Sequence, residues 1–352
     1  MEEAVRLVQS AGVRRFRVVQ GKRTKPDARL YAGAGKVGEI ARAASEINAM
    51  YVVFNHALSP AQERNVEKQI VRRVMDRAEL ILEIFAQRAK TSEGKLQVEL
   101  AQLQHLATRL VRGWTHLERQ RGGLGKTGGP GETQLELDRR YIATRTRTLR
   151  RKLTDLQKQR SVQRRARARG EVLSVSIVGY TNAGKSTLFN ALARAKAYEA
   201  DQLFATLDTT TRRVWVPEAG NVVISDTVGF IRDLPHGLVA AFRATLEETV
   251  HADLLLHVVD ASSPVREEQA QAVDEVLAEI PAGEAPRLLA WNKIDLAGLE
   301  PGVERDQYGR ISRVFLSART GAGLELLRDA IVEFAQARAA ARGAPAPEAH
   351  TL

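Results

Sequence analysis

The feature that most constrains the fold of this chain is a glycine-rich loop at residues 179–186, which reads Gly-Tyr-Thr-Asn-Ala-Gly-Lys-Ser. The apolar run 172–178 before the loop predicts a strand, and residues 187–194 after it predict a helix. Strand, glycine loop and helix in this order are the context that a phosphate-binding loop requires. The alternative, a chance match to a short pattern, is disfavoured by the agreement of these flanks.

The residue types in the loop fit the chemistry of a nucleotide phosphate. Glycine at 179 and 184 allows backbone N–H groups to turn toward a phosphate, because no Cβ stands in the way. Lys185 brings a positive charge to the β and γ phosphates, and the Ser186 hydroxyl can ligate Mg²⁺. We therefore expect nucleotide contacts from every residue of the loop, namely Gly179, Tyr180, Thr181, Asn182, Ala183, Gly184, Lys185 and Ser186.

The composition describes a globular protein with room for about two domains in 352 residues. The chain has no cysteine, which excludes disulfides, thiolate zinc sites and cysteine nucleophiles. No apolar run approaches the roughly 18 residues of a membrane span, and the first residues lack the order of a signal peptide. We expect a cytoplasmic monomer, with peripheral association to a larger assembly or a membrane left open.

The net charge of +11 is concentrated in one segment. Residues 139–169 contain 13 Lys or Arg and a single acid, Asp155, a balance of +12, so the rest of the chain sums to −1. Pairing between helical neighbours cannot balance this run, because like charges repel along a helix. The segment predicts contact with nucleic-acid phosphates that depends on salt and little on sequence. A solvated helix face is the alternative.

Residues 1–95 predict a small α/β domain. Strands are expected at 15–19 and 50–54, and a helix at 61–70 with Ser59 as its N-cap and Pro60 at its first position.

Residues 96–170 predict two long helices packed antiparallel as a hairpin. Ile142, Leu149 and Leu156 are seven residues apart, the spacing of a coiled-coil seam. The glycine-rich loop Gln120–Gly131 joins the helices and is either a connector or a surface that approaches RNA closely.

Residues 171–338 alternate strand and helix, which predicts a mostly parallel sheet of six strands with helices on both faces. The expected strands are 172–178, 213–216, 222–225, 254–259, 287–291 and 312–316. His257 lies inside the fourth of these strands and is expected in the core. Residues 339–352, rich in Ala, Arg and Pro, are expected to form a frayed tail.

Two further motifs follow the loop in the order of a nucleotide switch. Asp226-Thr-Val-Gly229 follows an apolar strand, so that Asp226 can hold the Mg²⁺ shell and the Gly229 amide can sense a γ-phosphate. The threonine-rich loop at 204–211 can close over the metal. The expected contacts are Phe204, Ala205, Thr206, Leu207, Asp208, Asp226, Thr227, Val228 and Gly229.

A fourth motif, Asn292-Lys-Ile-Asp295, selects the base. The carboxylate of Asp295 can accept hydrogen bonds from the ring N–H and exocyclic amine of guanine, whereas adenine has no donors there; such a mismatch can be worth roughly 10⁴-fold. Ser317-Ala-Arg319 can add a main-chain amide. The base site is therefore expected to comprise Asn292, Lys293, Ile294, Asp295, Ser317, Ala318 and Arg319, and the nucleotide to be GTP or GDP.

Phe230 stands where many GTPases place the glutamine that orients the attacking water. A phenylalanine cannot orient water, so intrinsic hydrolysis should be slow and a partner surface or an ion must complete the site. Asn182 suggests K⁺, which some GTPases hold with an asparagine at this position; the alternative is that Asn182 only shapes the loop.

The chain resembles the HflX family of ribosome-associated GTPases over most of its length. The resemblance rests on residues 76–89 and 93–103, on Gly-Gly-Pro-Gly-Glu-Thr-Gln-Leu-Glu-Leu-Asp-Arg-Arg at 128–140, and on the sequences of the GTP motifs, Phe230 included. It implies binding to the large ribosomal subunit, with the hairpin reaching ribosomal RNA, and dissociation, rescue or recycling of ribosomes under stress. By the same resemblance Ser186 and Thr206 would ligate Mg²⁺, and Lys185, Thr206 and Gly229 would be catalytic.

The chain departs from the family at Asp208-Thr209, where relatives often have Asp-Pro. Two other functions stay open from the residues alone. One is an RNA-binding adaptor with a degenerate nucleotide site, and the other is an RNA remodeller that hydrolyses ATP through its front domain.

Overall fold

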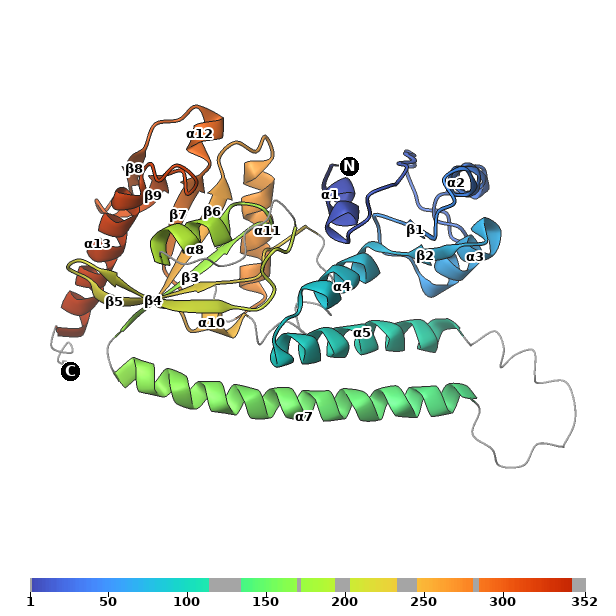
Figure 1. Cartoon of the computed structure of the whole chain (residues 1–352), viewed down its shortest axis with the longest axis horizontal. Coiled ribbons are helices and arrows are strands. Elements are labelled where there is room, and N and C mark those ends of the chain that lie inside the picture. The colour runs from blue at the N-terminus through green and yellow to red at the C-terminus, as the bar shows by residue number, and fades with distance from the viewer. Residues whose placement is uncertain are drawn as a thin grey trace, which may run out of the picture. The chain divides into compact units, whose positions relative to one another are not determined.

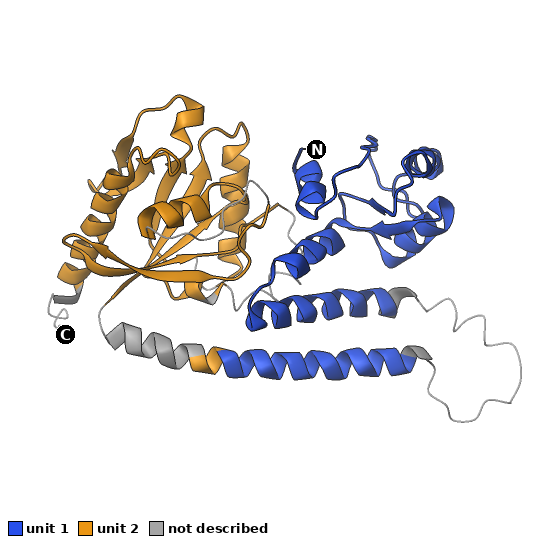
Figure 2. Ribbon diagram, in the orientation of Figure 1, with its two compact units in different colours: residues 1–156, 235–242 blue, residues 157–234, 243–352 orange. Residues whose placement is uncertain are grey.

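The computed structural model describes residues 2–113, 134–169, 172–193, 203–232, 246–280 and 285–343. These residues fall into two compact units (Figure 2), one running to Leu156 and the other beginning at Gln157. Each unit is described by itself.

Unit 1 begins with a small α/β core. Its elements are α1 (Glu2–Ser10), α2 (Ala34–Glu46), β1 (Tyr51–Val53), α3 (Pro60–Ile70), β2 (Arg73–Met75) and α4 (Arg77–Arg88). Strands β1 and β2 pair in parallel, with Val52 opposite Val74. Apolar side chains of α2 and α3 bury themselves around these strands.

The predicted start of α3 is confirmed by a capping box. Ser59 Oγ accepts a hydrogen bond from the Gln62 amide at 3.2 Å, and Gln62 Oε1 accepts one from the Ser59 amide at 3.0 Å. Pro60 occupies the first turn, where its missing N–H costs no helical hydrogen bond.

The strand predicted at residues 15–19 is wrong, because these residues form no strand. Val18 is 44 % exposed, and Arg17 pairs with Glu46. A strand needs a neighbouring backbone and a buried face, and this segment has neither among the described residues.

Two long helices, α5 (Ser92–Gly113) and α7 (Gln134–Arg169), run side by side (Figure 1); unit 1 contains α5 and the residues of α7 up to Leu156. Leu149 and Leu153 of α7 pack on Leu100 of α5, and Ile142 is also buried. Arg145 Nε donates to Glu99 Oε1 at 2.6 Å across the pair. The predicted seam is therefore confirmed at Ile142 and Leu149. The loop Gln120–Gly131 lies outside the described residues.

A buried ion cluster joins α5 to the α/β core of unit 1. Arg109 of α5 donates from Nη2 to Asp76 Oδ2 at 2.6 Å and also pairs with Glu63 of α3. Asp76 is 2 % exposed and caps α4 by accepting from the Glu79 amide at 2.9 Å. Burial lowers the pKa of Arg109. Removing one member of such a cluster would leave a buried charge without compensation. The cluster therefore holds the end of α5 that leads into the hairpin loop.

Unit 2 contains a sheet of seven strands among its described residues, in the order β4-β5-β3-β6-β7-β9-β8. The strands are β3 (Leu173–Gly179), β4 (Thr210–Val216), β5 (Gly220–Asp226), β6 (Leu254–Asp260), β7 (Arg287–Asn292), β8 (Gly302–Arg305) and β9 (Ile311–Phe315). The inner strands are parallel, and both edge strands are antiparallel to their neighbours.

The prediction of six strands missed β8. This strand is four residues long and mostly exposed, and it pairs on one side only, with β9. It therefore carries no buried apolar run that a sequence pattern could reveal.

Helices cover both faces of the sheet, as predicted (Figure 1). Leu188 of α8 (Lys185–Ala193) and Leu327 of α13 (Leu324–Gly343) belong to the core on one face. Helix α11 (Arg266–Ala278) packs on the other face, and α10 (Glu247–Val250) and α12 (Ile294–Ala297) are single turns. Among the described residues, none of the helices combines the length and the apolar character needed to cross a membrane.

His257 lies in β6 and is 2 % exposed, as its position in the strand pattern predicted. Its Nδ1 lies 3.9 Å from Asp274 Oδ1 of α11, and its Nε2 has no hydrogen-bond partner among the described residues. Burial lowers the pKa of His257 from 6.5 to about 4, partly opposed by Asp274. The imidazole is therefore a neutral core group at neutral pH.

This burial predicts an acid sensitivity of stability. Between about pH 6.5 and pH 4 the unfolded chain protonates His257 while the folded chain does not, so stability falls as the pH drops through this window and is unaffected above it. Replacing His257→Leu should reduce the loss of unfolding free energy between pH 7 and pH 5 by about 2 kcal/mol. Urea unfolding of both proteins at the two pH values measures the difference, and equal losses would contradict the assignment.

Candidate nucleotide-binding site

The glycine-rich loop connects β3 to α8 at the carboxyl edge of the sheet, as predicted. Gly179 and Gly184 have φ values of 152° and 92°. A Cβ on Gly179 would lie 2.3 Å from the Val258 carbonyl oxygen, and one on Gly184 would lie 2.2 Å from Asn292 Nδ2. Backbone conformation and lack of space therefore both require glycine at these two positions.

Lys185 lies folded against its own loop. Its Nζ donates to the Tyr180 carbonyl at 2.7 Å, and the residue is 6 % exposed. Burial lowers the pKa of Lys185 to about 8, while Asp226 raises it and Lys293 lowers it further. An ammonium so poorly solvated gains from an anion that enters the pocket.

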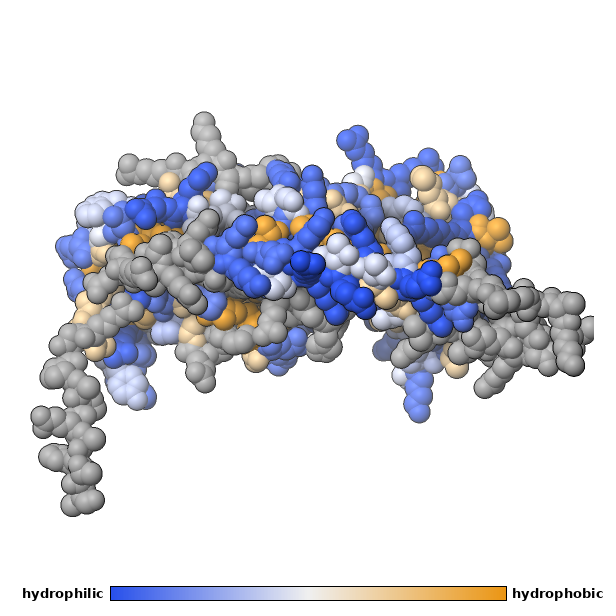
Figure 3. All heavy atoms as spheres, turned by 90° about the horizontal axis from the view of Figure 1, so that it is seen from below, coloured by the Kyte–Doolittle hydropathy of each residue, from blue (hydrophilic) through white to orange (hydrophobic). Residues whose placement is uncertain are grey.

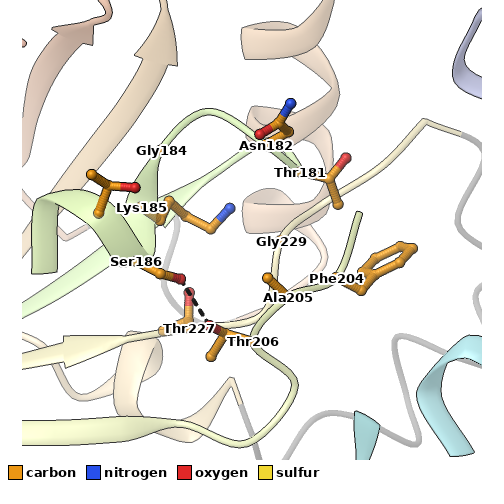
Figure 4. A pocket seen from close by; sticks show the side chains of 11 residues that line it. Thr181, Asn182, Gly184, Lys185, Ser186, Phe204, Ala205, Thr206, Thr227 and Gly229 are labelled. Carbon is orange, nitrogen blue, oxygen red and sulfur yellow. Dashed lines mark hydrogen bonds between the residues drawn. The ribbon is translucent and has the colours of Figure 1, made fainter. Parts of the chain in front are cut away.

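Two hydroxyls, of Ser186 and Thr206, face each other beside Lys185 (Figure 4), and the Asp226 carboxylate is hydrogen-bonded to both. The Oγ atom of Ser186 lies 2.8 Å from Thr206 Oγ1 and 2.8 Å from Asp226 Oδ2, and Thr206 Oγ1 lies 3.0 Å from the same carboxylate oxygen. Asp226 is fully buried, which raises its pKa, and its Oδ1 has no hydrogen-bond partner in the described residues. Hard oxygen ligands of this kind suit Mg²⁺, so these residues fit the metal ion.

The segment after Asp226 is bonded to the loop. The Thr181 amide donates to the Phe230 carbonyl at 2.7 Å, and the Phe230 amide donates to the Gly179 carbonyl at 3.1 Å. Tyr180 adds a hydroxyl that accepts from the Arg232 amide at 2.9 Å. The Phe230 side chain is 1 % exposed and thus belongs to the core.

Gly229 lies close to the loop in this arrangement. A Cβ at this position would meet Thr181 Cγ2 at 2.8 Å and Lys185 Nζ at 3.0 Å. The backbone of Gly229 is therefore within reach of a group that Lys185 binds.

The base motif, Asn292–Asp295, is hydrogen-bonded to the carbonyls of the phosphate-binding loop. Asn292 Nδ2 donates to the Ala183 carbonyl at 2.9 Å, and Asn292 Oδ1 accepts from the Ala318 amide at 2.9 Å. Lys293 Nζ donates to the Asn182 carbonyl at 2.7 Å. One asparagine thus joins all three segments, which are far apart in the sequence.

The pocket (Figure 4) brings together part of the predicted phosphate and metal residues, including Lys185, Ser186 and Thr206. Its lining consists of Thr181, Asn182, Gly184, Lys185, Ser186, Thr187, Phe204, Ala205, Thr206, Thr227 and Gly229. Asn292–Asp295 and Ser317–Arg319 lie outside this lining; of these residues, Asn292 and Lys293 donate to carbonyls of the loop, and the Ala318 amide donates to Asn292. Asp295 is exposed in α12, where a base can approach its carboxylate. Thr187 and Asp260 were not predicted; Thr187 directly follows the loop, whereas no sequence signal indicates Asp260.

Comparison with known proteins agrees with this geometry. The family model described as "50S ribosome-binding GTPase" matches residues 174–293. Models described as "GTP-binding GTPase N-terminal" and "GTP-binding GTPase Middle Region" match residues 1–86 and 88–167. Fold, loop and models together define a P-loop GTPase with two additional N-terminal regions.

The relatives narrow this class to one family. The chain is 56 % identical over 334 residues to GTPase HflX of Escherichia coli, covering 95 % of this chain and 78 % of that protein, and 49 % identical over 327 residues to GTPase HflX of Magnetococcus marinus, covering 93 % and 76 %. A crystal structure of SsGBP in complex with GDP is 26 % identical, covers 96 % of this chain and 95 % of that one, and gives a TM-score of 0.51. The chain belongs to the HflX family of GTPases.

The proposed base contact predicts a change of nucleotide preference. In Asp295→Asn the side-chain amide would face the guanine amine with its own N–H₂, so GTP affinity should fall by about 10⁴-fold. Xanthine has a carbonyl in place of that amine, so XTP should bind the variant better than GTP. Competition against a fluorescent GDP analogue measures both affinities.

Asp329→Asn is the matched control, since it makes the same charge change at an exposed position of α13. It should leave the affinity for GTP unchanged. An Asp295→Asn protein that still prefers GTP would contradict the base assignment.

Proposed function

We propose that this GTPase binds the large ribosomal subunit in its GTP state, is released on hydrolysis, and acts in dissociation, rescue or recycling of ribosomes. The observation that supports the proposal is a line of cations along α7, and the description of the matched family model agrees with it. Within this reading residues 1–95, 96–170, 171–338 and 339–352 are the N-terminal domain, hairpin, GTP-binding domain and tail, and the protein acts as a monomer.

The line of cations consists of Arg140, Arg147, Arg151 and Lys158, all exposed. Their spacings of seven, four and seven residues keep them on one face of a helix. Leu149, fully buried against α5, lies on the opposite face. Hydrophilic residues accordingly run along the face of α7 that points away from α5 (Figure 3). A rigid row of cations on a packed hairpin suits the phosphates of a folded RNA, which recur at regular intervals.

The GTP site supports a switch whose chemistry needs help. In our proposal Ser186 and Thr206 ligate Mg²⁺, which would neutralise phosphate charge, and the Asp226 carboxylate holds the metal shell. Lys185 and the Gly229 amide contact the β and γ phosphates. Phe230 is buried and cannot reach the attacking water. Hydrolysis should therefore be slow until the ribosome or an ion completes the site.

Asn182 supports K⁺ as that ion. It lines the pocket beside Lys185 with a φ of 62°, a left-handed conformation that asparagine tolerates. A side-chain carbonyl at this place can supply one oxygen ligand to a monovalent cation at the phosphates.

The potassium assignment predicts a loss of ion dependence. Wild-type protein should hydrolyse GTP at least about 10-fold faster in K⁺ than in Na⁺, because a cation held at the phosphates acts as an added positive charge. Asn182→Gly keeps the left-handed backbone but removes the ligand, so its rate in K⁺ should fall to the rate in Na⁺. Single-turnover assays in matched chloride buffers measure this, and equal wild-type rates in the two buffers would exclude K⁺.

Ribosome binding is tested by sedimentation. With a non-hydrolysable GTP analogue the protein should travel with large subunits, and with GDP it should not. The double variant Arg147→Glu/Arg151→Glu should weaken binding at least about 10-fold, since each lost phosphate contact lowers affinity and the salt slope. The control Arg42→Glu/Lys68→Glu reverses two exposed charges on α2 and α3 and should bind normally. No nucleotide-dependent shift of the wild type would overturn the proposal.

A further inference from the structure

Asp260, the last residue of β6, belongs to none of the GTP motifs but is firmly held beside them. Its Oδ2 lies 2.7 Å from Lys293 Nζ. Its Oδ1 accepts from the Ser262 amide at 3.0 Å and from the Ser262 hydroxyl at 2.6 Å. The Asp260 side chain is 18 % exposed, so the carboxylate has little freedom to turn toward solvent.

Lys293 carries this constraint to the phosphate-binding loop. The same Nζ that pairs with Asp260 donates to the Asn182 carbonyl at 2.7 Å, and the side chain is 22 % exposed. A charge-assisted hydrogen bond is stronger than a neutral one. Without its carboxylate partner this half-buried ammonium would gain by moving toward water, and the Asn182 carbonyl would lose its donor.

The hydrogen bond from Asn292 to the next residue of the loop indicates what the Asn182 carbonyl controls. Asn292 holds the carbonyl of Ala183, the next residue of the loop, at 2.9 Å. Two consecutive side chains of the base motif thus hold two consecutive carbonyls of the phosphate-binding loop. Because the carbonyl and the following N–H of a peptide plane point in opposite directions, holding the carbonyls orients the amides that follow them.

We propose that Asp260 is a positioning residue for guanine-nucleotide binding, which acts through Lys293 to hold the Asn182 carbonyl and so sets the shape of the phosphate-binding loop. Asp260 touches neither base nor phosphate in this role. Its effect is to couple the base-reading end of the site to the phosphate end. The inference rests on guanine-nucleotide binding by this family and is independent of ribosome binding.

A double-mutant cycle tests the proposal. The dissociation constant of a fluorescent GDP analogue is measured for wild type, Asp260→Ala, Lys293→Met and the double variant. Asp260→Ala should weaken binding at least about 10-fold, as expected for the loss of a charge-assisted contact. In the Lys293→Met background the same change should alter binding less than about 2-fold, because the residue through which Asp260 acts is gone.

A second readout separates positioning from general damage. Because Asp260 acts on the phosphate loop, Asp260→Ala should weaken GDP much more than guanosine, measured by competition. Three results would each overturn the proposal. They are an equal loss of affinity for GDP and guanosine, an equal effect of Asp260→Ala in the wild-type and Lys293→Met proteins, and a loss of GDP affinity under about 2-fold. If the alanine variant does not fold, the cycle is run with Asp260→Asn, which keeps the size of the side chain and removes its charge.

Asp253 offers a matched control at the other end of the same strand. It directly precedes β6, is 26 % exposed, and pairs with Arg338 at 2.5 Å. Asp253→Ala removes a comparable ion pair from the same unit, so it should lower the midpoint of thermal unfolding and leave the GDP affinity within about 2-fold. A loss of GDP affinity equal to that of Asp260→Ala would assign both residues to the stability of the fold and overturn the specific role.

Discussion

The GTP site depends on the hydrogen bonds that hold the carbonyls of the phosphate-binding loop from behind. A loop of backbone amides cannot collect around a phosphate unless its carbonyl groups find partners elsewhere, since each peptide plane presents both. Asn292 and Lys293 supply those partners from the end of β7. Asn292 also accepts from the Ala318 amide, so the same side chain places the third segment of the site. The parallel sheet makes this possible by bringing the carboxyl ends of β3, β7 and β9 to one edge.

The opposite side of the loop is hydrogen-bonded to the segment after Asp226, for which we propose contact with the γ-phosphate. The backbone pairing of Thr181 and Phe230 brings Gly229 close to Lys185. This proximity explains why Gly229 has no side chain, because a Cβ would meet Thr181 and Lys185. Burial of Phe230 gives the segment an apolar anchor in place of a catalytic group. This burial is the basis for the slow intrinsic hydrolysis that we propose.

In the hairpin, one face of α7 packs on α5 and the opposite face carries exposed cations. The hairpin is held together by a narrow apolar seam around Leu149, which leaves the opposite face of α7 for cations. Near the end of α5 that leads into the hairpin loop, Arg109 pairs with Asp76 and Glu63 in a largely buried cluster. A buried cluster of this kind is costly to desolvate, but its geometry is specific, so it fixes the direction of α5 against the α/β core.

The sequence by itself determined the type of site. The strand-loop-helix around the phosphate-binding loop and the seam of α7 could be predicted, because both depend on local geometry. The seven-residue period predicted which side of α7 is buried for the same reason. Charge counting found the basic segment without any knowledge of contacts.

Only the tertiary structure decided the rest. Strand β8 escaped prediction because a short, exposed edge strand exists only through its pairing with β9. The strand expected at 15–19 failed to form because its three apolar residues, which alternate with or follow two arginines, found no neighbouring backbone among the described residues. The contact of Asp260 with Lys293 could not be predicted because the two residues are 33 positions apart in the chain. Contacts between distant residues depend on how the sheet brings its strand ends together, and no local pattern records them.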